Sequence, residues 1–307
     1  IKNCYFYNNM ARLNAGSVDL MNSNCTIVNA AFEQNKARDG ACITALLSSL
    51  KIKRSNLTYN AALSNGGSIM AIQSILRIKD VQFGENEAES MGGCVYMVDT
   101  LCTITKGCFV SNSAQCGDVL YIQSSNLSLE GSFFLFNQRG KETDWASVTL
   151  VNNKYEVPVH CEIKKCGFSN YTNPDGSSRP HILFTRSIKM VVSQCQFDTS
   201  PYVSIGGPNS DEFWSTNQFK QRISHPYKRF CEHILVENAR YVIDTKKQYS
   251  KMFVIVVLAS MIVGVMGLSI FISCMFRVKR LIVKDELQHC VRLPSHAGNP
   301  ETSVVGV

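Results

Sequence analysis

The chain has 307 residues, which is enough for one elongated domain or two compact ones. It carries 31 Lys and Arg residues against 24 Asp and Glu residues, a formal net charge of +7. The basic residues are scattered up to residue 251, and the only tight cluster follows an apolar segment near the C-terminus. This distribution argues against a nucleic-acid-binding protein. Because no signal-peptide pattern precedes the first motif, we expect part of the N-terminus to be missing.

Two signatures recur through the first 140 residues. One is a Gly-containing turn that ends in an aliphatic residue, with steps of 25, 26, 26 and 24 between Val18, Ile43, Ile69, Val95 and Val119. In its last copy, Cys116 stands where Gly92 stands one copy earlier. The other signature is Phe-x-x-Asn-x-Ala, with steps of 26, 25, 26, 26 and 25. Its aromatic or Leu positions are Phe6, Phe32, Leu57, Phe83, Phe109 and Phe134. Two signatures with one period indicate a repeat architecture.

Within each repeat, the residues seven and five positions before the Phe are apolar: Cys25 and Ile27, Leu50 and Ile52, Leu76 and Ile78, Cys102 and Ile104, Leu127 and Leu129. This alternation predicts short strands with that face inward. A repeat of this length built only of strands predicts an all-β, right-handed parallel β-helix with about 25 residues per coil. We expect the Phe side chains to fill the core. We also expect the Asn side chains to form one column: Asn9, Asn35, Asn60, Asn86, Asn112 and Asn137.

Beyond Asn137 the spacing loosens. Phe168 and Phe197 keep apolar residues at the same offsets, so we predict two further coils with inserted loops. We therefore assign residues 1–207 to the β-helix. Residues 208–251 lack the pattern and are predicted to form a cap and a juxtamembrane stalk.

Residues 252–276 form a run of 25 residues without a charge. As a helix this run would extend about 37 Å, enough to cross a bilayer, so we predict one transmembrane helix followed by a cytoplasmic tail at 277–307. Basic residues flank both ends and do not decide the orientation. The glycosylation sequons at Asn24, Asn56, Asn126 and Asn170 all precede the span, as do eleven of the thirteen cysteines. Both facts favour an extracellular N-terminus, which is a single-pass type I topology at the plasma membrane.

Taken together, the repeated Gly-Gly-small-Ile/Val and Phe-x-x-Asn motifs resemble the polymorphic outer-membrane protein (Pmp) repeats of chlamydial autotransporters. They also resemble the Pmp-like surface proteins of parasitic protists. The resemblance covers about residues 1–200. The single apolar segment that follows is more similar to the protist set. The resemblance implies a β-helical ectodomain exposed to host cells or the environment, with adhesion as its expected role.

The cysteines suggest three kinds of role. Cys25, Cys102 and Cys161 fall on inward positions and are expected to act as small buried apolar residues. Cys166 and Cys195 lie two residues before the Phe of consecutive coils, so they are the candidate disulfide. Cys274, at the inner edge of the span, is a candidate acylation site.

No motif points to a metal or a cofactor. His160, Cys161 and Cys166 come nearest to a metal cluster but lack ligand spacing, so we expect neither group to be bound. Partners are expected to be membrane lipid and host-cell or extracellular ligands, and no nucleic acid.

The leading function is non-enzymatic surface display for adhesion or ligand contact. The alternative is a membrane-tethered β-helix enzyme, a lyase or hydrolase acting on polysaccharide. Such an enzyme needs three or more acidic or Arg side chains within about 8 Å on one lateral face. All six histidines are expected to lie outside the regular coils, and no nucleophile motif is present.

Overall fold

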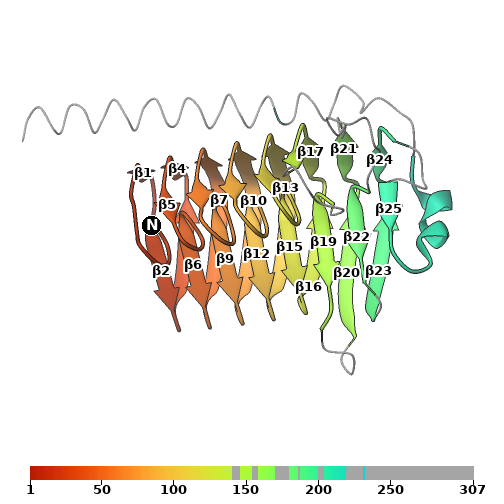
Figure 1. Ribbon diagram of the computed structural model, residues 1–307, viewed down its shortest axis with the longest axis horizontal. Coiled ribbons are helices and arrows are strands. Elements are labelled where there is room, and N and C mark those ends of the chain that lie inside the picture. The colour runs from red at the N-terminus through yellow and green to blue at the C-terminus, as the bar shows by residue number, and fades with distance from the viewer. Residues whose placement is uncertain are drawn as a thin grey trace, which may run out of the picture. The chain divides into compact units, whose positions relative to one another are not determined.

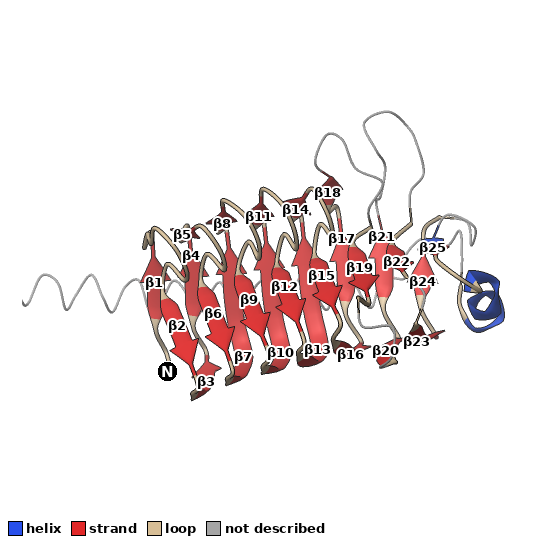
Figure 2. Ribbon diagram, turned by 60° about the horizontal axis from the view of Figure 1, so that its bottom comes forward, coloured by secondary structure: helices blue, strands red, loops and turns tan. Residues whose placement is uncertain are grey.

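The computed structural model describes residues 1–139, 146–153, 158–169, 180–185, 187–199, 204–218 and 231. These residues form a stack of coils in which every strand pairing is parallel (Figure 1). Each coil contributes strands to the sides of the stack (Figure 2). The predicted all-β parallel β-helix is therefore confirmed, with successive equivalent residues 25 or 26 positions apart through the regular coils.

Three sheets make up the sides. The twelve-stranded sheet contains β1 (Tyr5–Tyr7), β3 (Asn24–Val28), β4 (Ala31–Glu33), β7 (Ser49–Thr58), β10 (Ile75–Gly84), β13 (Leu101–Val110), β16 (Asn126–Glu130), β17 (Phe133–Leu135), β20 (Val159–Lys164), β21 (Gly167–Ser169), β23 (Ile188–Ser193) and β24 (Gln196–Phe197). The eight-stranded sheet contains β2 (Val18–Met21), β6 (Ile43–Leu46), β9 (Ile69–Ile72), β12 (Val95–Val98), β15 (Leu120–Gln123), β19 (Val148–Val151), β22 (Ile182–Phe184) and β25 (Ile205–Gly206). The five-stranded sheet contains β5 (Lys36–Ala37), β8 (Ala61–Ala62), β11 (Glu87–Ala88), β14 (Ser113–Ala114) and β18 (Gln138–Arg139).

The core follows the predicted inward positions. The Leu76 and Ile78 side chains pair in register with the corresponding residues of both neighbouring coils and are buried. The Phe rings form a column through the interior, with ring centroids 5.0 Å apart between Phe83 and Phe109 and 4.8 Å apart between Phe109 and Phe134. Leu57 interrupts this column between Phe32 and Phe83. Stacked rings at this spacing keep apolar surface away from water along the length of the stack.

The predicted asparagine column is also confirmed. Each Asn Nδ2 donates to the Oδ1 of the Asn one coil further along the chain, at 2.8–3.0 Å from Asn9 to Asn137. The same Oδ1 accepts the backbone N–H of the preceding Asn, as Asn112 does from Asn86 at 2.9 Å. Asn35, Asn60, Asn86, Asn112 and Asn137 are buried. Because their side-chain amides are hydrogen-bonded on both sides, this polar column can stand beside an apolar core.

A second polar column, which the sequence analysis missed, lies nine residues before each Phe position. It consists of hydroxyl side chains: Ser23, Ser48, Ser74, Thr100 and Ser125. Ser74 Oγ accepts the backbone N–H of Ser48 at 3.0 Å and donates to the carbonyl of Ile72 at 2.8 Å. Each hydroxyl thus satisfies a backbone group at the corner between two sheets.

One predicted alignment is wrong by a residue. The structure pairs Val95 with Leu120, so Gly117, and not Cys116, occupies the place of Gly92. The reason is conformational, because φ is +68° at Gly92 and +63° at Gly117, in the left-handed region that favours glycine. The step between these two coils is therefore 25 residues rather than 24.

Gly93 gives a test of this packing. A Cβ at Gly93 would lie 2.1 Å from the carbonyl oxygen of Asp118, whereas a Cβ at Gly84 would meet side-chain atoms only at 3.4 Å. We expect Gly93→Ala to lower the free energy of unfolding by about 2–3 kcal/mol, because backbone must shift between coils. Gly84→Ala should change it by less than about 0.5 kcal/mol. Urea unfolding of both variants checks this, and equal effects would mean that the coils are spaced differently.

The looser coils follow the predicted register. Phe168 stacks on Phe134 at 4.6 Å and on Phe197 at 4.9 Å. The 3-10 helix η1 (Ser210–Thr216) follows, and its Phe213 contacts Phe184 with ring centroids 6.1 Å apart. Parallel pairing also extends past residue 207, because Gln218 forms a bridge with Gln196.

The predicted transmembrane segment, 252–276, and the tail, 277–307, lie outside the described residues. Among the described residues, no helix combines the length and the apolar character needed to cross a membrane.

Candidate ligand-binding face

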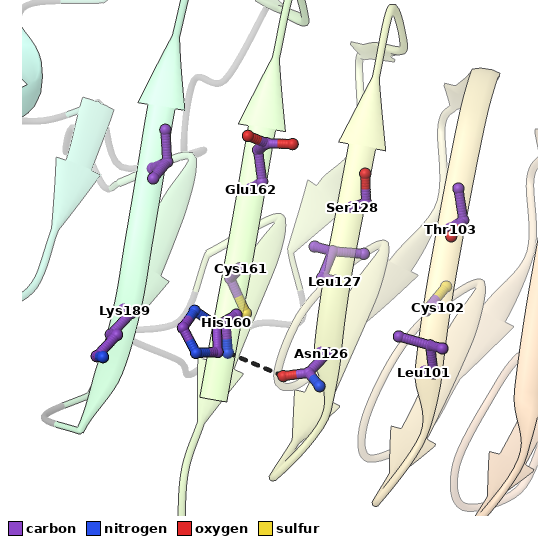
Figure 3. Close-up of a pocket in the computed structure, with 11 residues that line it drawn as sticks. Leu101, Cys102, Thr103, Asn126, Leu127, Ser128, His160, Cys161, Glu162 and Lys189 are labelled. Atoms are coloured by element: carbon purple, nitrogen blue, oxygen red, sulfur yellow. Dashed lines mark hydrogen bonds between the residues drawn. The ribbon is translucent and has the colours of Figure 1, made fainter. Parts of the chain in front are cut away.

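The outer surface of the twelve-stranded sheet is hollowed over the neighbouring strands β13, β16, β20 and β23 (Figure 3). We call this depression, of about 410 Å³, the sheet groove. The inward residues Cys102, Leu127 and Cys161 lie at its base and are buried. Because side chains alternate along a strand, the residues between them point outward. They form two rows in register, which are Leu101, Asn126, His160 and Lys189, and then Thr103, Ser128, Glu162 and Val191.

Polar contacts link residues of the groove, both between neighbouring strands and within one strand. The Asn126 Oδ1 accepts the backbone N–H of His160 at 2.9 Å, the dashed line in Figure 3. The Glu162 carboxylate pairs with Lys164 at 2.6 Å, and the Glu130 carboxylate pairs with Lys165 at 3.0 Å. Both carboxylates on this part of the face are thus held by a lysine. The hydroxyls of Thr103 and Ser128 and the ammonium group of Lys189 can hydrogen-bond a polar ligand lying across the strands.

The same face becomes strongly basic toward the N-terminal coils. The parallel register places Lys51 beside Arg77 and Lys53 beside Lys79 on the adjacent strands β7 and β10. We call these four outward-pointing residues the basic array. These basic residues are scattered in the sequence, but the 26-residue offset brings two separate pairs onto one surface.

The predicted glycosylation sites differ in accessibility. Asn24 and Asn126 are exposed and begin the strands β3 and β16. Asn56 lies inside β7, paired with Gln82 and Ala31 on the two neighbouring strands, and is 8% exposed. A glycan needs an accessible acceptor, so we no longer expect modification at Asn56. Asn170 and the candidate acylation site Cys274 lie outside the described residues.

The candidate disulfide partners are aligned but not bonded. Cys166 and Cys195 occupy the same position in consecutive coils, and both are free thiols. The backbone N–H of Cys166 donates to the Cys195 sulfur at 3.5 Å. Each thiol donates to the carbonyl two residues before it, at 3.2 Å for Cys166 and 3.4 Å for Cys195. In the preceding coil Ser132 occupies this corner, and its hydroxyl makes the equivalent hydrogen bonds. The two thiols therefore take the place of that hydroxyl within the stack.

A different disulfide joins Cys108 to Cys231. Cys108 points outward from β13, where it packs beside Phe133, and its Cα lies 5.7 Å from that of Cys231. The two residues are 123 positions apart, and Cys231 lies in a segment without the repeat. No spacing rule in the sequence could have joined them.

Several free thiols are shielded from reagents. Burial raises the pKa of the Cys161 thiol to about 12, because the thiolate would lose its hydration. At pH 8 only about one Cys161 thiol in ten thousand would be ionised. We expect maleimide to label the partly exposed Cys4 in the folded chain and to reach Cys161 only after unfolding. Mass spectrometry of labelled peptides, with and without denaturant, checks this, and fast native labelling of Cys161 would contradict the burial.

Two histidines lie in the looser coils beyond Asn137. His160 is an outward residue of β20. His181 is buried, with its ring centroid 5.6 Å from that of Phe168, and its Nε2 lies 3.1 Å from Asp198 Oδ1. Within the described ranges, no three His, Cys, Asp or Glu side chains gather in an arrangement that could hold a metal ion.

Searches against protein-family models, curated proteins and solved structures find no match to this chain.

Proposed function

We propose that this chain is a membrane-anchored surface protein that contacts host-cell or extracellular ligands through the outer face of the twelve-stranded sheet. The observation that carries the proposal is this face itself. Its side chains stand in register across β7, β10, β13, β16, β20 and β23. A rigid sheet of this kind presents binding groups at fixed spacing, which reduces the entropy lost when a long ligand binds.

The proposed cellular location is supported by the amino-acid sequence, including residues outside the described part of the chain. The uncharged run 252–276 has the length of a membrane span, and the candidate glycosylation sites precede it. In this proposal the coils lie outside the cell and residues 277–307 form the cytoplasmic tail. The repeated Gly-Gly and Phe-x-x-Asn motifs, now seen to form corners and columns of a β-helix, support a Pmp-like protein of the type found in parasitic protists.

Binding is better supported than polysaccharide cleavage. A glycosidase needs a carboxyl group poised to donate a proton and a second carboxylate free to act on the sugar. Among the described residues around the sheet groove, Glu130 and Glu162 are each ion-paired with a lysine. Each lysine ammonium group lies against the Oε1 atom of its carboxylate, so each of these carboxylates has a cationic partner.

Attachment of cells that display the full chain tests the proposal. Thr103 and Ser128 point outward beside the groove, so Thr103→Trp with Ser128→Trp should obstruct it. Leu63 is 66% exposed outside this sheet, so Leu63→Trp is the control. We expect displaying cells to attach to host cells or immobilised glycans, the double variant to fall to background, and the control to be unaffected. Equal attachment with and without the chain would contradict a role in ligand contact.

A further inference from the structure

We infer that the basic array binds a linear polysaccharide that carries sulfate or carboxylate groups. This inference rests on the proposed function and names a ligand class for the same face. The array consists of Lys51, Lys53, Arg77 and Lys79, which point to solvent from two adjacent strands. Neighbouring strands lie about 4.8 Å apart, and alternate residues along a strand about 6.6 Å apart. The four side chains therefore start from the corners of a small rectangle and can reach several anionic groups of one chain.

Further positive charge borders the array. Arg54 and Lys106 are exposed at the bends of β7 and β13, on either side of Asp80 in β10. The outward positions and bends of β3, β7, β10 and β13 carry six basic side chains and one carboxylate, that of Asp80. The net charge of this region is therefore +5. A surface with one sign of charge concentrates ligands of the opposite sign and speeds their association.

The array differs from the charged residues farther along the same sheet. Like charges side by side on neighbouring strands destabilise a sheet. Toward the other end of the same face, Glu130 pairs with Lys165 and Glu162 with Lys164. None of the four array residues forms an ion pair with another residue in the described part of the chain. Local conflicts of this kind are expected at functional sites, where a ligand supplies the missing charge.

The surroundings favour a polysaccharide over a nucleic acid. The outward residues beside the array include Thr26, Ser49, Thr103 and Thr105, whose hydroxyls can hydrogen-bond sugar hydroxyl and sulfate groups. Aromatic platforms for stacked bases are not found among the outward residues of these strands before their bends. A sheet face also presents no helix or ribbon that could enter a groove of duplex DNA.

The test uses the purified full-length chain in detergent, with heparin as the sulfated probe and hyaluronan as the carboxylated probe. Neutral dextran and duplex DNA serve as comparisons. The array variant combines Lys51→Gln, Lys53→Gln, Arg77→Gln and Lys79→Gln. The control combines Arg12→Gln, Lys36→Gln and Arg38→Gln, which removes three exposed positive charges outside the twelve-stranded sheet. Melting temperatures establish folding, and the array variant should melt at the same or a higher temperature because repulsion is relieved.

We expect the parent chain to bind heparin or hyaluronan, with an affinity that falls steeply as salt increases. The array variant should bind at least about tenfold more weakly, with a shallower dependence on salt, and the control should change by less than about threefold. Heparin carries sulfate in addition to carboxylate, so stronger binding of heparin would assign the additional affinity to sulfate, and equal or stronger binding of hyaluronan would show that carboxylate is sufficient. Either result supports the inference.

Three results would overturn it: unchanged binding by the array variant, an equal loss in the control, or tighter binding of duplex DNA that depends on the array. The attachment experiment separates this inference from the proposed function. If displaying cells attach through the sheet groove while heparin and hyaluronan do not bind, the inference fails and the proposed function stands. If the array binds heparin but displaying cells do not attach, the proposed function fails and the ligand class stands.

Discussion

Replacing Asn86 with alanine is expected to lower the free energy of unfolding by about 4–6 kcal/mol. Asn86 lies in the middle of the asparagine column, and its Nδ2 donates to the carbonyl of Leu57 at 2.8 Å and to Asn112 Oδ1 at 3.0 Å. Its Oδ1 accepts from the backbone and the side chain of Asn60 at 3.1 and 2.9 Å. The substitution leaves buried donors and acceptors in the coils on both sides without partners, and each costs about 1–3 kcal/mol.

Asn9 supplies the matched control, because it stands at the end of the same column and is only partly buried. Asn9→Ala removes the two hydrogen bonds that its Nδ2 donates, to Asn35 and Ser17, and should cost about 1–2 kcal/mol. Urea unfolding of the full-length chain, followed by circular dichroism, compares the two variants. An Asn86→Ala variant no less stable than Asn9→Ala would show that the column does not hold the coils together.

Replacing Phe109 with alanine is expected to lower the free energy of unfolding by about 3–5 kcal/mol. Phe109 is fully buried and stacks on Phe83 and Phe134 at 5.0 and 4.8 Å. Because each ring packs against the coils on both sides, the cavity weakens the interfaces on which the stability of a repeat protein depends. Thermal and urea unfolding measure the loss.

Two further substitutions serve as references for the size of this loss of stability. Phe109→Leu should cost only about 1–1.5 kcal/mol, because Leu57 occupies the same column naturally. Phe136 is 52% exposed, so Phe136→Ala should change stability by less than about 0.5 kcal/mol. If Phe109→Ala were as mild as Phe136→Ala, the ring of Phe109 would have to point outward.

Most of the fold could be predicted because its buried positions repeat. Ile78, Phe83 and Asn86 each occupy a place that recurs every 25 or 26 residues, so the sequence alone reveals the coil and its inward face. Cys116 was wrongly aligned with Gly92 because the alignment used the aliphatic residues, which do not reveal which residue has a positive φ. The hydroxyl column was missed although Ser74 and Thr100 recur at a constant offset, because serine and threonine are common enough elsewhere to hide it.

The candidate site was far less predictable. Outward residues need not repeat, so Lys51 and Arg77 look like scattered charges until the register places them side by side. The alternation along a strand also cannot predict burial on the outer face. Asn56 is buried although its position in β7 points away from the core. The Cys108–Cys231 disulfide joins a regular coil to a segment without the repeat, which no local pattern records.

The measurement that most directly tests the central claim of a membrane-anchored extracellular β-helix is protease treatment of intact cells. The cells would express the chain behind a cleavable secretion signal, with one epitope tag between the signal and Ile1 and another after Val307. We expect protease to remove the N-terminal tag while the C-terminal tag survives, because the uncharged run 252–276 would hold the tail inside the membrane barrier. Loss of the C-terminal tag with survival of the N-terminal tag would invert this topology and contradict the proposed role in extracellular ligand contact.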